Sequence, residues 1–206
     1  MFPFFLVLIL FIYFDVLAEN KAKKSSLPIC EGNSMGNWTD CFGFYEAKAG
    51  WSYSGEYKNG KFSGFGTYIY ASGSRYSGNW LNNQKDGYGT FTWFSGEIYK
   101  GGWKKNQKNG NGIFTSIDGH KYNGNWKKNK FSGIGIYYWP DGRKYEGSWK
   151  NDLFHGSGKY IYANGDTYIG EFKNGFFDGL GVKTFISGKP SQKGIWKKDK
   201  LEFIKN

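Results

Sequence analysis

Residues 53–75 read YSGEYKNGKFSGFGTYIYASGSR, and the chain repeats this stretch with different side chains up to residue 190. Four glycine slots recur in each of six copies and hold 24 of the 32 glycines. A fixed period of about 20 to 50 residues is typical of a repeat array, in which each copy is one structural unit. The sequence therefore predicts a single array over residues 53–190. A tyrosine opens each copy at a spacing of 23 residues, at Tyr53, Tyr76, Tyr99, Tyr122, Tyr145 and Tyr168.

Each copy has the residue pattern of a β-hairpin. Positions one, three and five hold the tyrosine, a glycine and a large aromatic residue, whereas the positions between them are mostly polar; this alternation of two is typical of a strand. Gly, Asn or Asp at position eight favours a turn, and a GxG pair then leads into a second aromatic-rich strand. We therefore expect consecutive hairpins to pair into one long antiparallel sheet. The large aromatic residues at position five are Tyr57, Trp80, Trp103, Trp126, Trp149 and Phe172.

The motif YxGxW, followed by KN, a GxG pair and a later glycine, resembles the MORN (membrane occupation and recognition nexus) family of repeats. The resemblance covers residues 53–188 without an insertion or deletion. It implies an all-β fold, namely an elongated single-layer antiparallel sheet of stacked 23-residue hairpins, and it implies little chemistry. Members of the family are described both as scaffolds that pair through their sheets and as membrane-associated proteins.

The glycine and aromatic slots have one physical explanation. A single-layer sheet has no second layer to cover its apolar face, so the rings must lie over the sheet itself, and a bare Cα beside a ring leaves room for it. Burying each large ring stabilises the fold by roughly 1.5 to 3 kcal/mol. The two aromatic rows are therefore interpreted as structural. The alternative is that they form a ledge for a glycan or a partner peptide.

The first eighteen residues, MFPFFLVLILFIYFDVLA, are predicted to form the helix of a secretory signal peptide. An apolar run of this length that ends in small residues favours cleavage after Ala18 and export to a periplasm or to the medium. The alternative is a membrane anchor through residues 1–18, against which Asp15 and the short span argue, because about 20 apolar residues are needed to cross a bilayer. Residues 19–29 are predicted to be a flexible spacer.

The chain has only two cysteines, Cys30 and Cys41, and export predicts that they form a disulfide. Cys41 lies one period of 23 residues before Gly64 and so occupies the equivalent position. Residues 30–52 are therefore interpreted as a degenerate half repeat. We expect the disulfide to hold a loop over the first strand, whose free edge otherwise invites association. Residues 191–206 are interpreted as a second half repeat that closes the far end.

The formal net charge is +11, and lysines are concentrated at the first turn of each hairpin. Stacked hairpins would align these turns along one side of a rod, with overlapping potentials. One hypothesis is contact with an anionic surface; the alternative is a role in solubility alone. Export argues against nucleic acid as a partner. The lysines are Lys58, Lys61, Lys85, Lys104, Lys105, Lys108, Lys127, Lys128, Lys130, Lys150 and Lys173.

The sequence contains no pattern of a catalytic site. His120 and His155 are the only histidines, and each GxG pair continues into a strand rather than into the helix that a phosphate-binding loop requires. We therefore predict no cofactor, no metal and no small-molecule substrate. The sequence predicts a non-catalytic exported scaffold or protein-interaction rod, whose partner is an unidentified protein or a second copy. The alternative is a peripheral binder of anionic lipid or polymer.

Overall fold

The computed structural model describes residues 25–32 and 34–202. They form one antiparallel sheet of fifteen strands, whose order in space is their order in the sequence. One short 3₁₀ turn, η1 (Met35–Asn37), precedes the sheet. The strands are β1 (Cys41–Glu46), β2 (Ser52–Lys58), β3 (Lys61–Ile69), β4 (Arg75–Leu81), β5 (Gln84–Thr92), β6 (Ile98–Lys104), β7 (Gln107–Thr115), β8 (Lys121–Lys127), β9 (Lys130–Tyr138), β10 (Lys144–Lys150), β11 (Leu153–Ile161), β12 (Thr167–Lys173), β13 (Phe176–Thr184), β14 (Gln192–Lys197) and β15 (Lys200–Glu202).

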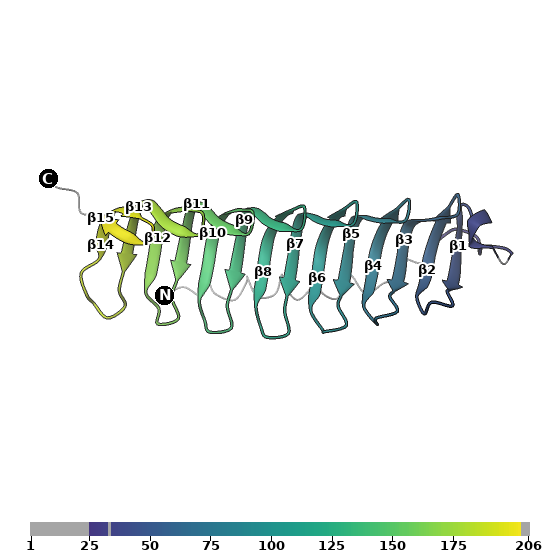
Figure 1. Cartoon of the computed structure of the whole chain (residues 1–206), viewed down its shortest axis with the longest axis horizontal. Coiled ribbons are helices and arrows are strands. Elements are labelled where there is room, and N and C mark those ends of the chain that lie inside the picture. Colours follow the sequence, from purple (N-terminus) through teal and green to yellow (C-terminus); the bar gives the residue numbers. More distant parts are fainter. Residues whose placement is uncertain (1–24, 33, 203–206) are drawn as a thin grey trace, which may run out of the picture.

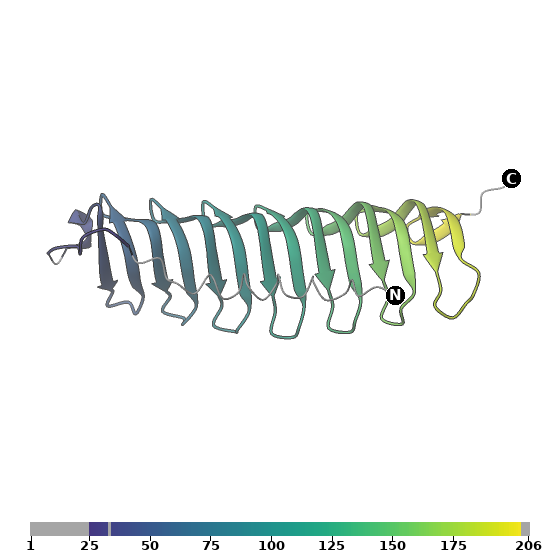
Figure 2. The same ribbon diagram turned by 180° about the vertical axis from the view of Figure 1, so that it is seen from behind.

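The sheet is an elongated ribbon one layer thick (Figures 1 and 2). The turns within the repeats lie along one long edge of the ribbon, and the turns between repeats lie along the other. The predicted all-β, single-layer fold is confirmed. The predicted signal helix over residues 1–18 lies outside the described residues. Within residues 25–32 and 34–202, no helical segment has the length and hydropathy needed to cross a bilayer.

Two glycine slots exist because a tyrosine ring or the backbone of the neighbouring strand lies directly against the glycine. A Cβ added to Gly66 would be 2.2 Å from the hydroxyl oxygen of Tyr53, and one added to Gly78 would be 2.4 Å from the Cα of Gly89. The first glycine of each GxG pair has another cause. Gly87, for example, has a φ of 103° where the register between β4 and β5 shifts at a β-bulge, a backbone that glycine adopts without strain.

The rings form one continuous row along the ribbon. Every tyrosine that opens a repeat is 0% exposed, and the rings at position five are 1% to 7% exposed. The two types alternate edge to face, which is a favoured geometry for aromatic pairs. The ring of Trp80, for example, lies 5.0 Å from that of Tyr76 and 5.6 Å from that of Tyr53. The predicted stacking of these residues in rows is confirmed.

The first end of the ribbon is closed by the segment that precedes β1. The predicted disulfide between Cys30 and Cys41 is confirmed. Pro28, which the sequence assigned to a flexible spacer, contacts β1 instead, because its carbonyl oxygen accepts a hydrogen bond from the backbone N–H of Phe42 (2.8 Å). Trp38 ends the ring row, with its ring edge to face against Tyr57 at 4.9 Å. Trp38 lies outside the 23-residue copies, so no periodic pattern in the sequence indicated this role.

Candidate interaction surfaces

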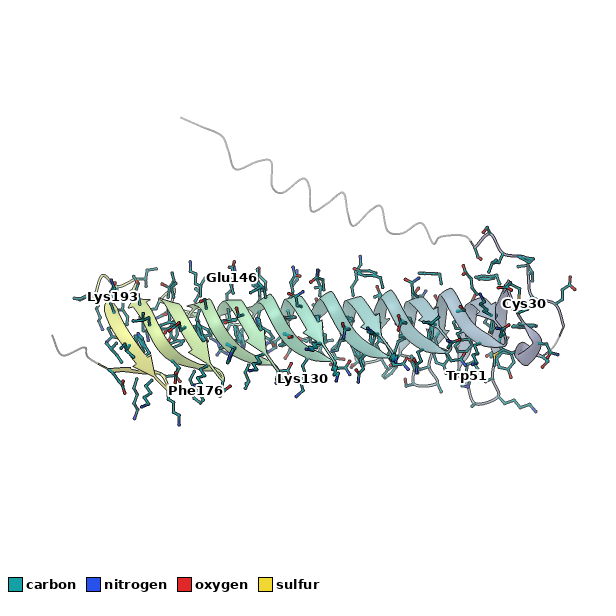
Figure 3. All side chains as sticks on the ribbon, turned by 90° about the horizontal axis from the view of Figure 1, so that it is seen from above. Cys30, Trp51, Lys130, Glu146, Phe176 and Lys193 are labelled. Carbon is teal, nitrogen blue, oxygen red and sulfur yellow. A yellow bond between two sulfur atoms is a disulfide. The ribbon has the colours of Figure 1, made fainter. Side chains whose placement is uncertain are left out.

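The ribbon has three surfaces. The ring face carries the aromatic row, the open face is the opposite side of the sheet, and the turn edge is the row of turns within the repeats and at β14–β15. Figure 3 shows Glu146 and Lys193 on the open face, on the other side of the ribbon from Trp51.

Nine of the eleven predicted lysines are exposed at the turn edge: Lys58, Lys61, Lys104, Lys105, Lys127, Lys128, Lys130, Lys150 and Lys173. The terminal turn adds three more exposed lysines, Lys197, Lys198 and Lys200. Within the described residues, none of these twelve lysines forms an ion pair. The turn edge is therefore strongly positive.

For Lys85 and Lys108, the predicted position at the turn edge is wrong. Lys85 is the cross-strand partner of Trp80, so it lies on the ring face, and its Nζ is 4.7 Å from the centre of the Phe91 ring. The Nζ of Lys108 is 4.2 Å from the centre of the Trp126 ring. Burial lowers the pKa of Lys108, and it lowers the pKa of Lys85 to about 8.

The sequence contained a signal for this inward position. Lys85 and Lys108 align, at the 23-residue period, with Phe62, Phe131, Phe154 and Phe177. Each of these phenylalanines stacks on the tyrosine of its own repeat, with ring centres 3.7 to 3.9 Å apart. Lysine therefore occupies a ring slot in two repeats, and its ammonium lies over the faces of the neighbouring rings.

Five turns of the turn edge, those with Asn or Asp at the last turn position, are each fixed to the preceding repeat by a pair of hydrogen bonds. The backbone N–H of Asn129 donates to the carbonyl oxygen of Lys108 (3.0 Å), and the side-chain Oδ1 of Asn129 accepts from the N–H of Lys108 (2.7 Å). Asn106 makes the same two bonds to Lys85. The turn edge is therefore a rigid row, since neighbouring turns are linked through β5 and β7.

The aromatic rows cannot act as a ledge, because almost none of their ring surface is exposed. The polar atoms of these rings also form hydrogen bonds within the sheet. The hydroxyl of Tyr76 donates to the carbonyl oxygen of Asn79 (3.0 Å), and the Nε1 of Trp80 donates to that of Gly66 (3.1 Å). The structural interpretation of these rings therefore holds, and the alternative of a glycan or peptide ledge does not.

The open face bears exposed aliphatic side chains that the sequence analysis did not single out. Leu180 is 63% exposed, Ile169 is 54% exposed and Ile195 is 44% exposed, and Leu180 and Ile195 are cross-strand partners. Beside them runs a shallow groove of about 620 Å³, whose floor includes Gly147, Gly158 and Gly170. Side chains of both charges line it, namely Glu146, Lys159 and Glu171.

The described part of the chain offers no site for metal chemistry. In residues 25–32 and 34–202, no group of three or more His, Cys, Asp or Glu side chains is arranged to hold a metal ion. His120 instead shares a hydrogen bond with the hydroxyl of Tyr137 through its Nδ1 (3.0 Å).

Comparison with known proteins gives one match at the level of a family and none among curated sequences. The family model described as the MORN repeat matches residues 53–75, 76–98, 99–121, 122–142, 145–167 and 168–189. The chain matches no curated protein sequence.

Two solved structures from Drosophila melanogaster resemble part of the ribbon. One is the SAS-4 (dCPAP) TCP domain in complex with a proline-rich motif of Ana2 (dSTIL), at 11% identity and a TM-score of 0.42, covering 76% of this chain and 90% of that one. The other is the TCP10c domain of Sas-4, at 11% identity and a TM-score of 0.39, covering 76% of this chain and 99% of that one.

Proposed function

Because the chain belongs to the MORN repeat family, we propose that it is a non-catalytic, exported rod that binds a protein partner along its open face. The observation that carries this proposal is the cluster of exposed aliphatic side chains on β12–β14, where Ile169, Leu180 and Ile195 are 44% to 63% exposed. Aliphatic side chains gathered on an uncovered face, with charged groups beside them, are typical of a protein interaction site.

The ring row makes the ribbon suitable for this role. Because the buried rings contact each other from Trp38 to Trp196, they hold consecutive hairpins in one register. The open face is thus a preformed surface, which lowers the entropic cost of binding.

Export is the second element of the proposal. The apolar run over residues 1–18 and the disulfide between Cys30 and Cys41 support it, since disulfides persist in oxidising compartments. Fractionation of the host, with the mass of the mature chain, tests it. We expect a mature chain that begins at Glu19 outside the cytoplasm, and a full-length chain in the cytoplasm would contradict export.

The binding proposal is tested by capturing partners from the exported fraction with wild-type protein and with a Leu180→Asp, Ile169→Asp variant. Both side chains are exposed, so the variant is expected to fold, which near-ultraviolet circular dichroism of the rings would verify. Ile186→Asp is the matched control, because Ile186 is 74% exposed but lies between β13 and β14. We expect only the open-face variant to lose the partner. Equal capture by all three proteins would contradict the proposal.

A second candidate function is binding of anionic lipid or polymer along the turn edge. The specific observation in its favour is the row of exposed lysines without ion pairs. Sedimentation of the mature protein with anionic and with neutral vesicles, at two salt concentrations, tests the lipid form of this function. Binding that is absent or insensitive to salt would remove it, because contacts between exposed charges weaken as salt rises.

A further inference from the structure

Positive charge is concentrated at two neighbouring turns of the turn edge. The turns β6–β7 and β8–β9 together carry five exposed lysines, which we call the central lysine cluster: Lys104, Lys105, Lys127, Lys128 and Lys130. The turn before the cluster, β4–β5, has no exposed lysine and presents Leu81, which is 53% exposed. The turn after it has one exposed lysine, Lys150, together with a carboxylate, Asp152, and Leu153, which is 45% exposed. The cluster is therefore a bounded site and not a uniform part of the edge.

Two of the five lysines occupy a backbone position that does not favour lysine. Lys105 has a φ of 48° and Lys128 a φ of 50°. Four other repeats hold asparagine at the equivalent position, with φ of 50° to 52°: Asn59, Asn82, Asn151 and Asn174. Asparagine tolerates this left-handed region better than lysine does. Lysine at the tip of the turn therefore opposes local conformational preference, as it also does at Lys198 (φ 45°) in the terminal turn. At Lys105 and Lys128 it adds positive charge to two neighbouring turns that already carry other exposed lysines.

The positive charges of the central lysine cluster are not neutralised by nearby carboxylates. None of the five lysines has an ion-pair partner within residues 25–32 and 34–202. The carboxylate of Asp86 accepts a hydrogen bond from the backbone N–H of Lys105 (3.2 Å) and holds the turn itself. The hydrogen bonds between Asn129 and Lys108 keep the second turn at a fixed place beside the first.

We propose that the central lysine cluster binds a linear polyanion that crosses both turns. The proposal deepens the second candidate function and rests on it. Neighbouring turns are separated by two strands, or roughly 10 Å, so an anion with a single phosphate or sulfate group cannot contact all five ammonium groups at once. An extended acidic chain can, and it needs no contact with the other turns. A bilayer lying along the straight edge would meet every turn, including β4–β5, which has no exposed lysine.

The test is calorimetric titration of the mature protein with a linear polyphosphate chain at several salt concentrations. The central variant is Lys105→Asn with Lys128→Asn. The matched control is Lys198→Asn, because Lys198 has a φ of 45° at the equivalent position of the terminal turn. We expect the central variant to bind at least about tenfold more weakly and with a shallower salt dependence, and the control to bind within about twofold of wild type. Both variants are expected to melt at higher temperature than wild type, so unfolding could not explain weaker binding.

Two further arms separate this site from its alternatives. Inorganic phosphate at the same total phosphate concentration is expected not to displace the chain, and displacement would overturn the proposal. Vesicles of phosphatidylglycerol and phosphatidylcholine in equal parts form the other arm. Vesicle binding that Lys198→Asn weakens as much as the central variant does would support the lipid form of the second candidate function and overturn the polymer site. Binding to neither probe would remove both.

Discussion

Single side chains in the ring row differ in whether their polar atoms are satisfied. The tyrosine that opens each repeat donates its hydroxyl hydrogen to a carbonyl oxygen three residues later, as Tyr76 does to Asn79. Tyr57 occupies a position that tryptophan holds in four repeats, and its buried hydroxyl has no partner among the described residues. An unsatisfied buried polar atom costs free energy, whereas a satisfied one does not. Replacing Tyr57 and replacing Tyr76 should therefore have opposite effects.

We expect Tyr57→Phe to raise the free energy of unfolding by about 1 kcal/mol and Tyr76→Phe to lower it by about 1 kcal/mol. Both substitutions remove one hydroxyl from a ring that is at most 1% exposed, so each controls for the other. Urea unfolding followed by tryptophan fluorescence measures the two changes. Destabilisation by Tyr57→Phe would show that its hydroxyl has a partner.

Lys85 should make stability depend on pH. Burial lowers its folded-state pKa to about 8, from an ordinary value of 10.5. Between these values the unfolded chain binds more protons than the folded one, so the contribution of Lys85 to stability rises with pH across this window and is unfavourable below it. We expect Lys85→Phe, which restores the ring of other repeats, to stabilise the fold by about 1 to 2 kcal/mol at pH 7, a value reduced for solvent access.

The measurement for Lys85 is the difference in unfolding free energy between Lys85→Phe and wild type, taken from pH 7 to pH 9.5. This difference is expected to shrink as the pH rises. Lys104→Met is the control, because Lys104 is exposed at the turn edge, and its difference from wild type should stay constant. A difference for Lys85→Phe that does not change with pH would contradict the argument.

At the scale of the hairpin, the different glycine positions of the repeat perform separate tasks. Gly89 lies beneath the ring of Tyr76, and an added Cβ would be 2.4 Å from the tyrosine hydroxyl oxygen. Gly110 has a φ of 83° at a bulge, and an added Cβ would meet no atom within 4 Å. The first position excludes a side chain because of packing, whereas the second is restricted only by backbone conformation.

We expect Gly89→Ala to destabilise the sheet by about 3 kcal/mol, because the ring of Tyr76 must move. Gly110→Ala should lower the free energy of unfolding by about 1 kcal/mol, because the alanine strains the left-handed backbone but meets no neighbouring atom. Thermal unfolding of the two variants measures this difference. Equal losses would mean that ring packing does not explain the glycine beneath it.

At the scale of the whole molecule, the ribbon is a linear array in which each hairpin contacts chiefly its neighbours. Stability in such an array is approximately a sum of local terms. The cap formed by the disulfide and Trp38 therefore acts on the first hairpins, and the distant repeats do not depend on it.

We expect the variant Cys30→Ser, Cys41→Ser to lose about 3 kcal/mol of local stability at this end. Amide hydrogen exchange measured by mass spectrometry should become faster in β1 and β2 and remain unchanged in β8 and β9. The oxidised wild-type protein is the reference. Faster exchange along the entire ribbon would show that the array unfolds as one cooperative unit.

Most of the architecture could be predicted from local patterns. Aromatic and polar side chains alternate along a strand, and Gly, Asn and Asp mark the turns, so the 23-residue period was sufficient to predict the hairpins and one long antiparallel sheet. The single layer was implied by the resemblance to the MORN family. The pairing of Cys30 with Cys41 followed from their being the only two cysteines. These features depend on residues close together in the chain.

The identity of the free surfaces required the tertiary structure. Whether a lysine near a turn points to the edge or beneath the rings depends on hairpin register: Leu81 pairs with Gln84, so Lys85 pairs with Trp80 and lies on the ring face. The rings that surround the ammonium group of Lys85 include that of Trp103, which is 18 residues later in the chain and belongs to the next repeat. The open face is likewise defined by cross-strand neighbours such as Leu180 and Ile195. The sequence period identifies equivalent positions in the repeats. Whether the side chain at such a position is buried depends on which side chains of the neighbouring repeats pack against it.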